Sequence, residues 1–264
     1  MTNKTNKKIT NVGGTATSNN NGSATVFVAT AESKARAKQL RLFAALAWLV
    51  AIGAQVAAIL LLFKQPLNMT MVIVLIAVDL VLVIVGSMLW KKSNRLDPAS
   101  EKDKFKFFVQ NQLGVIISAL AFLPLVVIAL TNKNLDGKQK GIIGGIAGLA
   151  FLIAGISSVD FNPPSVEQYT EQTQQVEQLN NGKNLVYWTK SGTAYHLFSD
   201  CSYINTNRTT EIFEGTVAQA RELKNITNLC NRCEGKAIKA NNLPQENQEE
   251  GAEKEAEEPA VAND

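Results

Sequence analysis

Four long apolar runs dominate the middle of the chain, and short polar segments separate them. The runs occupy residues 42–63, 69–90, 113–130 and 141–159. A helix needs roughly 17–25 apolar residues to cross the hydrocarbon core of a bilayer, because each residue adds about 1.5 Å. The pattern therefore predicts a four-helix transmembrane domain over residues 34–160, with a short basic helical segment at 31–41 leading into the first span.

Lysine and arginine gather on one side of the predicted spans. The N-terminal flank and the connection between the second and third runs carry ten of them: Lys34, Arg36, Lys38, Arg41, Lys91, Lys92, Arg95, Lys102, Lys104 and Lys106. The opposite connections carry four: Lys64, Lys133, Lys138 and Lys140. Because basic loops stay on the cytoplasmic side, we expect a multi-pass protein of the cell (inner or plasma) membrane, with both termini in the cytoplasm.

The polar remainder of the chain divides into four segments. Residues 1–33 are rich in Asn, Thr, Gly and Ser, and residues 241–264 carry seven glutamates. Such compositions bury too little apolar surface to fold, so both are predicted to be disordered tails. Residues 161–183 form a predicted linker with an amphipathic helix at 165–180, because Val166, Tyr169, Val176 and Leu179 recur on one face. Residues 184–240 form a predicted compact module.

The three cysteines and the single histidine of the chain all fall within this module. They are His196, Cys201, Cys230 and Cys233. An odd number of cysteines argues against a disulfide framework, and Cys230-x2-Cys233 has the spacing of a chelating pair. The alternatives are ordinary buried thiols with a satisfied histidine, or a redox pair. The clustering favours a structural Zn²⁺ site with a closed Cys3His ligand set, which leaves no position for a reactive water.

Further motifs surround these four residues. They read VYWTKSG at 186–192, YH at 195–196, GTVAQA at 215–220 and CNRC at 230–233. Together they resemble the zinc domain of the Ada DNA-repair protein and the similar C-terminal modules of bacterial nucleases and membrane proteins. The resemblance implies a small α+β fold with strands near 186–189 and 210–213 and a helix near 217–223. It also implies that the four residues named above are the zinc ligands.

The resemblance does not imply the repair activity of the Ada protein. That site has four cysteines, one of which accepts a methyl group, whereas histidine replaces one cysteine here. The chain also shows no repair or transcription domain. The expected fold class is thus an all-α membrane domain, a four-helix bundle, followed by a small α+β zinc-binding module.

Asp79 is the one ionisable residue inside the four apolar runs. Intramembrane carboxylates often mark ion or proton paths. A transporter usually has several polar groups at the same depth, however, and Gln55 is the only other notable one. A hydrogen-bonding role within the bundle is the first expectation, and a small transporter or channel that uses Asp79 is the alternative.

The fourth run contains overlapping small-x3-small patterns, which allow helices to approach closely. The glycines concerned are Gly141, Gly144, Gly145, Gly148 and Gly155. We expect them to serve packing within one chain, with oligomerisation as the alternative.

Eight cations and five carboxylates in the module leave a mild excess of +3. The cations are Lys183, Lys190, Arg208, Arg221, Lys224, Arg232, Lys236 and Lys239, and the carboxylates are Asp200, Glu211, Glu214, Glu222 and Glu234. A solvated face explains this excess as well as nucleic-acid binding does. No catalytic triad or phosphate loop is present, so we expect a non-enzymatic protein. Its module would bind a cytoplasmic protein partner, with nucleic acid as an alternative partner.

Overall fold

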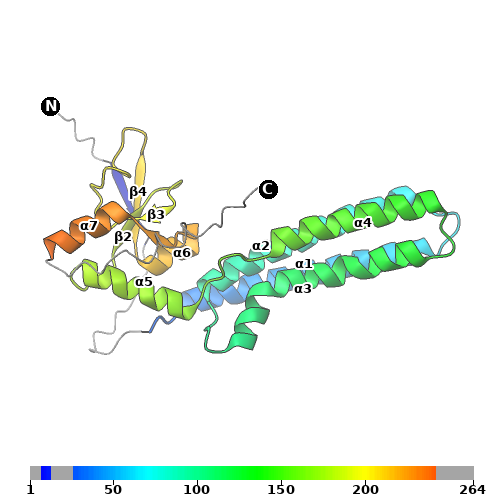
Figure 1. The fold of residues 1–264 in the computed structure, drawn as a ribbon, viewed down its shortest axis with the longest axis horizontal. Coiled ribbons are helices and arrows are strands. Elements are labelled where there is room, and N and C mark those ends of the chain that lie inside the picture. The colour runs from blue at the N-terminus through cyan, green and yellow to red at the C-terminus, as the bar shows by residue number, and fades with distance from the viewer. Residues whose placement is uncertain (1–6, 13–25, 242–264) are drawn as a thin grey trace, which may run out of the picture. The chain divides into compact units, whose positions relative to one another are not determined.

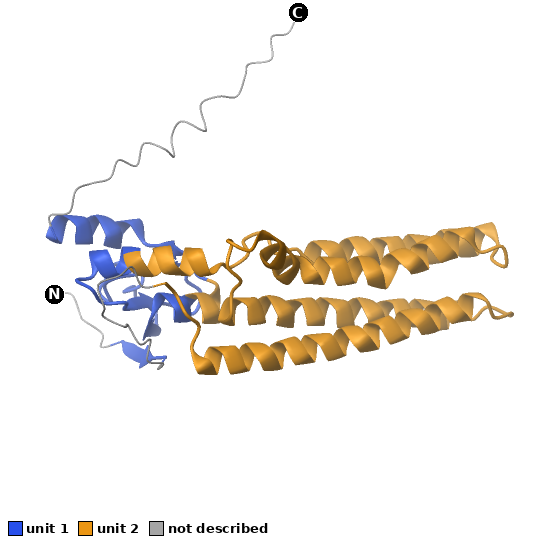
Figure 2. Ribbon diagram, turned by 90° about the horizontal axis from the view of Figure 1, so that it is seen from below, with its two compact units in different colours: residues 1–13, 175–220, 226–264 blue, residues 14–174, 221–225 orange. Residues whose placement is uncertain are grey.

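The computed structural model describes residues 7–12 and 26–241, which contain seven α-helices and five short strands (Figure 1). These residues form two compact units (Figure 2). The helical unit comprises residues 14–174 and 221–225, and the α+β unit comprises residues 1–13, 175–220 and 226–264. Most of the two predicted disordered tails, at residues 1–6, 13–25 and 242–264, lies outside the described residues.

Four long helices make up most of the helical unit: α1 (Ala31–Leu62), α2 (Met69–Leu96), α3 (Lys104–Thr131) and α4 (Gly137–Ser158). They run side by side in alternating directions, with α1 along α2 and α3 along α4, while α2 also contacts both α3 and α4 (Figure 1). Each helix is long and apolar enough to cross a membrane, which confirms that the four apolar runs form long helices.

Three of these helices extend by six or more residues beyond their apolar runs, all at the same end of the bundle. The predicted basic segment at 31–41 is continuous with α1, α2 continues to Leu96, and α3 begins at Lys104. Side chains cap the two starts: Thr30 accepts a hydrogen bond from the Ser33 amide, and Asp103 accepts one from the Lys106 amide, each 3.0 Å long. Such caps satisfy backbone donors that would otherwise lack helical partners.

Alanines occupy many of the contacts between the four helices, together with a few large buried side chains such as Phe122, while many other large apolar side chains face outward. The buried residues include Ala51, Ala58, Ala121, Ala147 and Ala154. The exposed ones include Leu49, Val81, Leu120, Leu149 and Ile156. Frequent small residues between helices and branched apolar residues on the outside are typical of helices that pack within lipid.

The glycines of α4 do not all pack within the chain. A Cβ added at Gly144 would lie 2.8 Å from the Leu130 side chain, so this glycine allows α3 and α4 to approach closely. At Gly141, Gly145, Gly148 and Gly155 an added Cβ would meet nothing within 4 Å. The expectation that all five serve close packing within one chain is therefore correct for Gly144 and is not met at the other four, where a side chain would fit without contact.

Two further helices follow the bundle. α5 (Val166–Leu179) corresponds to the predicted amphipathic helix, and its residues Tyr169, Val176 and Leu179 are buried as the pattern predicted. α6 (Val217–Lys224) corresponds to the helix that the family resemblance implied near 217–223.

Five short strands and a last helix complete the α+β unit. β2 (Val186–Trp188) pairs antiparallel with β4 (Glu211–Gly215), close to the two strands expected from the resemblance. β3 (Ala194–Tyr195) pairs in parallel with β5 (Asn228–Leu229), and α7 (Asn231–Ala240) follows β5. Trp188, Tyr195 and Ile212 are among the buried side chains of the core that these elements enclose.

One strand comes from the segment that was expected to be disordered. β1 (Lys8–Asn11) pairs in parallel with β4, giving the sheet order β1-β4-β2. Lys8 forms a 3.3 Å ion pair with Glu211, and the Val12 amide donates to the Glu214 carbonyl at 2.9 Å. The composition of residues 1–33 did not predict this strand, because the strand is stabilised by the edge of β4, about 200 positions later in the chain.

Candidate metal centre

His196 follows β3 directly, and its backbone is fixed to β2. The Tyr187 amide donates to the His196 carbonyl and the His196 amide donates to the Tyr187 carbonyl, both at 2.7 Å. This double bridge sets the position of the imidazole, which is buried in the core of the α+β unit.

Cys201 lies in the turn that follows. Its carbonyl accepts hydrogen bonds from the amides of Ile204 (3.0 Å) and Asn205 (2.7 Å), and its own amide donates to the Phe198 carbonyl at 3.2 Å. These three bonds turn the chain back towards His196, so a side chain five positions along the sequence becomes a spatial neighbour.

The second pair of residues comes from the junction between β5 and α7. The Cys230 amide donates to the Tyr195 carbonyl at 2.9 Å, which holds the end of β5 beside β3 and next to His196. Cys230 is the N-cap of α7, and Cys233 lies in the first turn of that helix. The strand-to-helix turn therefore presents both thiols of the Cys-x2-Cys motif on one side.

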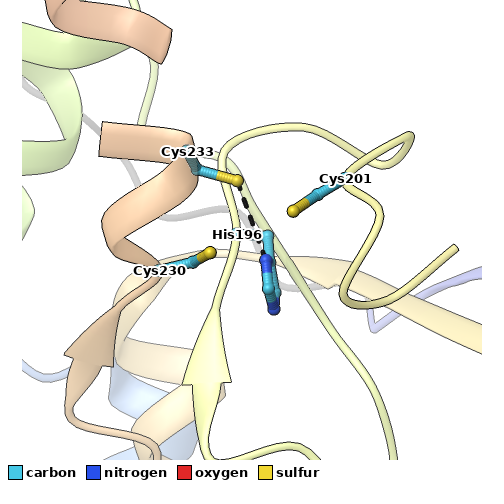
Figure 3. Close-up of side chains that lie close together, drawn as sticks. All are labelled: His196, Cys201, Cys230 and Cys233. Carbon is cyan, nitrogen blue, oxygen red and sulfur yellow. Dashed lines mark hydrogen bonds between the residues drawn. The ribbon is translucent and has the colours of Figure 1, made fainter. Parts of the chain in front are cut away.

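The four side chains converge on a common point (Figure 3). Their candidate donor atoms all lie within 4.8 Å of one another, and Sγ of Cys233 lies 3.7 Å from Nδ1 of His196. Zinc takes sulfur at about 2.3 Å and nitrogen at about 2.0–2.1 Å in a tetrahedron, which implies donor–donor separations of roughly 3.5–3.8 Å. The arrangement thus fits a divalent cation with four ligands. It also brings together every one of the four residues that the sequence singled out.

Burial sets the protonation of this cluster in the absence of a cation. All three cysteines are free thiols, and all four side chains are less than a tenth exposed. Loss of solvation raises the pKa of Cys233 to about 12, with the neighbouring Cys201 adding to the rise, and it lowers the pKa of His196. A bound cation supplies the positive charge that three buried thiolates need.

The donor set limits the chemistry that a bound cation could perform. Three sulfurs and one nitrogen would complete a tetrahedral shell around such a cation, with no open position for water or substrate. Within the part of the chain that the structure describes, this is the only group of three or more His, Cys, Asp and Glu residues placed to hold a metal.

A polar cavity of about 440 Å³ lies beside the cluster in the α+β unit. Its walls include His196 and Cys230 together with Tyr203, Asn228 and Arg232. The Arg232 guanidinium lies 5.8 Å from the Tyr203 ring centroid, and the Tyr203 side chain is exposed. Sequence reasoning assigned no role to Tyr203 and counted Arg232 only as a surface charge, since nothing local indicated that a cavity would form here.

Asp79 is buried in the helical unit, and neither of its carboxylate oxygens has a hydrogen-bond partner among the described residues. The expectation of a hydrogen bond across the bundle is therefore not met. Trp48 and Gly86 are in contact between the antiparallel α1 and α2. Gln55 and Asp79 each lie two helical turns from that contact, in the same direction along the bundle. The two residues are therefore at the same depth along the bundle axis.

We compared the chain with family models, with curated proteins and with solved structures, and none of the three comparisons finds a match.

Proposed function

We propose that this chain is a non-enzymatic, four-span protein of the cell membrane that carries a cytoplasmic zinc module for binding a partner protein. The observation that carries the proposal is the convergence of four buried donor atoms within 4.8 Å in a unit that has its own core. The motifs at 186–233 support an Ada-type metal-binding domain, without the methyl transfer of the Ada protein.

The donor set supports zinc over other divalent cations. Thiolate and imidazole ligands in a tetrahedral arrangement suit zinc, whereas calcium and magnesium take oxygen ligands. A unit with such short strands also gains from a metal, because structural zinc contributes on the order of 10–16 kcal/mol of apparent binding free energy in small domains.

The charge distribution supports a cytoplasmic location for the module. The ten cations of the predicted inner flanks belong to the start of α1, the end of α2, the start of α3 and the loop between α2 and α3. The 2.9 Å ion pair between Arg41 and Asp97 joins the start of α1 to this loop. With basic flanks on the cytoplasmic side and an even number of spans, both termini would lie inside the cell. A reducing compartment keeps three free thiols available for a metal.

The cavity beside the metal cluster supports partner binding. Tyr203 and Arg232 are residue types that contribute most of the binding energy at many interfaces, and both are exposed at this cavity. Nucleic acid is less favoured, because Arg221, one of the eight cations counted in the module, is buried and unavailable to phosphates.

Metal analysis of the full chain, purified in detergent micelles, tests the first half of the proposal. We expect close to one zinc per chain, and loss of that zinc in Cys233→Ser. Ser202→Ala, an exposed substitution one position after Cys201, is the matched control and should keep the metal. A metal-free protein, or equal metal content in the two variants, would rule out the zinc module.

Site-specific crosslinking in cells tests the second half. A photoreactive amino acid at position 203, in the cavity wall, should capture a defined partner, whereas the same amino acid at exposed position 239, outside the cavity, should not. The crosslink should disappear when Cys233→Ser is added. Capture of the same proteins from both positions, or from neither, would count against a partner at this cavity.

The unpartnered carboxylate of Asp79 favours a second candidate function, a small transporter or channel. A buried carboxyl group at mid-membrane depth costs free energy, and such residues usually serve binding or transport. Gln55 on the facing helix supplies one further polar group at the same depth. Proton and sodium flux into proteoliposomes should fall at least tenfold in Asp79→Asn while the variant still inserts and folds. Flux absent from the wild-type protein would exclude this function.

A further inference from the structure

A cavity of about 420 Å³ lies between the polar ends of three helices of the bundle, α1, α2 and α3. Its volume falls in the range of about 300–1,000 Å³ that is typical of small-molecule sites. The walls include Arg41 from α1, Trp90 from α2, and Phe105, Lys106, Val109 and Leu113 from α3.

The cavity lies at the depth where hydrocarbon gives way to lipid headgroups. Arg41 immediately precedes the first apolar run, Trp90 ends the second, and Leu113 begins the third. The ends of three separate apolar runs therefore lie together at this cavity. Tryptophan is enriched at this depth because its ring is largely apolar and its N–H is polar; here the Trp90 N–H donates to the Gln110 carbonyl at 2.7 Å.

The polar side of the cavity is positively charged. Lys106 is exposed and forms no ion pair within 4 Å among the residues that the structure describes. The Arg41 guanidinium is held in place by the Asp97 carboxylate at 2.9 Å and by the Trp90 ring, whose centroid is 5.8 Å away. Asp97 offsets the charge of Arg41, so the net charge at the cavity comes from Lys106.

The apolar side of the cavity is a stripe along α3. Phe105, Val109 and Leu113 are spaced four residues apart, so they lie on one face of the helix. The stripe begins in the polar extension of α3, where Phe105 is 80% exposed, and it ends at the first residue of the apolar run. An exposed phenylalanine here is explained by contact with lipid, because it would be costly to leave in water.

We propose that this cavity binds one anionic phospholipid. The phosphate would lie beside Lys106 and Arg41, and the glycerol and the first acyl carbons would follow the stripe from Phe105 to Leu113. A free phosphate would gain nothing from the apolar wall. A zwitterionic lipid would gain less from the net charge of Lys106. This proposal is independent of the zinc module.

Native mass spectrometry of the full chain, titrated in micelles with dioleoyl phosphatidylglycerol, tests it. We expect one tightly retained lipid and weaker retention of dioleoyl phosphatidylcholine. Glycerol 3-phosphate, which has the headgroup chemistry without acyl chains, should not be retained. Lys106→Gln should weaken phosphatidylglycerol binding about fivefold, the effect of one cation near an anionic lipid. Phe105→Ser should also weaken binding.

The matched control is Lys138→Gln, which removes the same charge from an exposed site in α4, outside the cavity. Lys106 and Phe105 are both exposed, so their variants should fold, and an unchanged thermal unfolding midpoint would show this. Equal retention of the two dioleoyl lipids would overturn the proposal, as would equal losses in the two lysine variants. Retention of glycerol 3-phosphate would point instead to a site for a soluble phosphate.

Discussion

The guanidinium of Arg221 lies over the ring of Tyr169, with Cζ 4.6 Å from the ring centroid, and both side chains are fully buried in the helical unit. Two amide oxygens of α5 complete the contact, those of Gln172 at 2.8 Å and Gln168 at 3.2 Å. A buried cation held by a ring and amide oxygens ties the end of α6 to α5.

Replacing Arg221 should therefore destabilise the helical unit. Arg221→Ala removes a desolvated cation–π contact and two charge-assisted hydrogen bonds, which together contribute at least about 2 kcal/mol. Thermal unfolding in micelles, followed by circular dichroism, measures the change. Arg208→Ala removes the same charge from an exposed position and should cost less than about 0.5 kcal/mol. Equal effects of the two substitutions would contradict the structural assignment of Arg221.

Glu222 should make the stability of the helical unit depend on pH. Burial raises the pKa of its carboxyl group to about 7, even though a 3.2 Å hydrogen bond from the Ser33 hydroxyl and the charge of Arg36 oppose the rise. Between pH of about 4.5 and 7 the folded state thus binds more protons than the unfolded state. The free energy of unfolding should therefore fall as the pH rises through this window.

Thermal unfolding at pH 5.5 and pH 8 measures this dependence. Glu222→Gln should stabilise the protein at pH 8 relative to the wild type and reduce the difference between the two pH values. Glu171→Gln, at an exposed position of α5, should leave the difference unchanged. A wild-type protein that is more stable at pH 8 than at pH 5.5 would oppose the assignment.

The close contact of α1 with α2 at Gly86 should not tolerate a methyl group. A Cβ at this position would lie 2.4 Å from Nε1 and 2.6 Å from Cδ1 of Trp48, which is buried and donates to the Val83 carbonyl at 3.4 Å. Gly86→Ala should destabilise the bundle by about 1–3 kcal/mol through overpacking. Gly53→Ala, where an added Cβ meets nothing within 4 Å, should be neutral or slightly stabilising. Similar unfolding midpoints for the two variants would show that the space between Gly86 and Trp48 can accept a methyl group.

X-ray absorption at the metal edge should identify the coordination shell directly. With His196 and the three cysteines as ligands, the spectrum should fit three sulfurs at about 2.3 Å and one nitrogen at about 2.0–2.1 Å. In His196→Cys the nitrogen shell should be replaced by a fourth sulfur while the metal is retained. Oxygen ligands in the wild-type spectrum would mean that the metal has a position open to water. The closed shell could then no longer be used as an argument against catalysis.

The main features predicted from the sequence depend on local patterns. A run of about 20 apolar residues specifies a transmembrane helix because backbone groups in lipid must bond within the segment, and the four runs indeed form α1 to α4. The four candidate ligands were found because the only histidine and all the cysteines of the chain lie within 38 positions. The buried face of α5 followed from the helical spacing of Tyr169, Val176 and Leu179.

What only the tertiary structure decided is which distant segments meet. β1 is a strand because β4 offers it an edge, Arg221 is buried because α5 covers it, and Gly144 alone among the α4 glycines faces another helix closely. Lys106 and Arg41 likewise line one cavity only because α1 and α3 lie next to each other at this end of the bundle. The sequence by itself determined the four apolar helices and the four candidate metal ligands, because composition and spacing act within one segment of the chain. Contacts between segments depend on which helix faces and strand edges come together, and local patterns do not encode that.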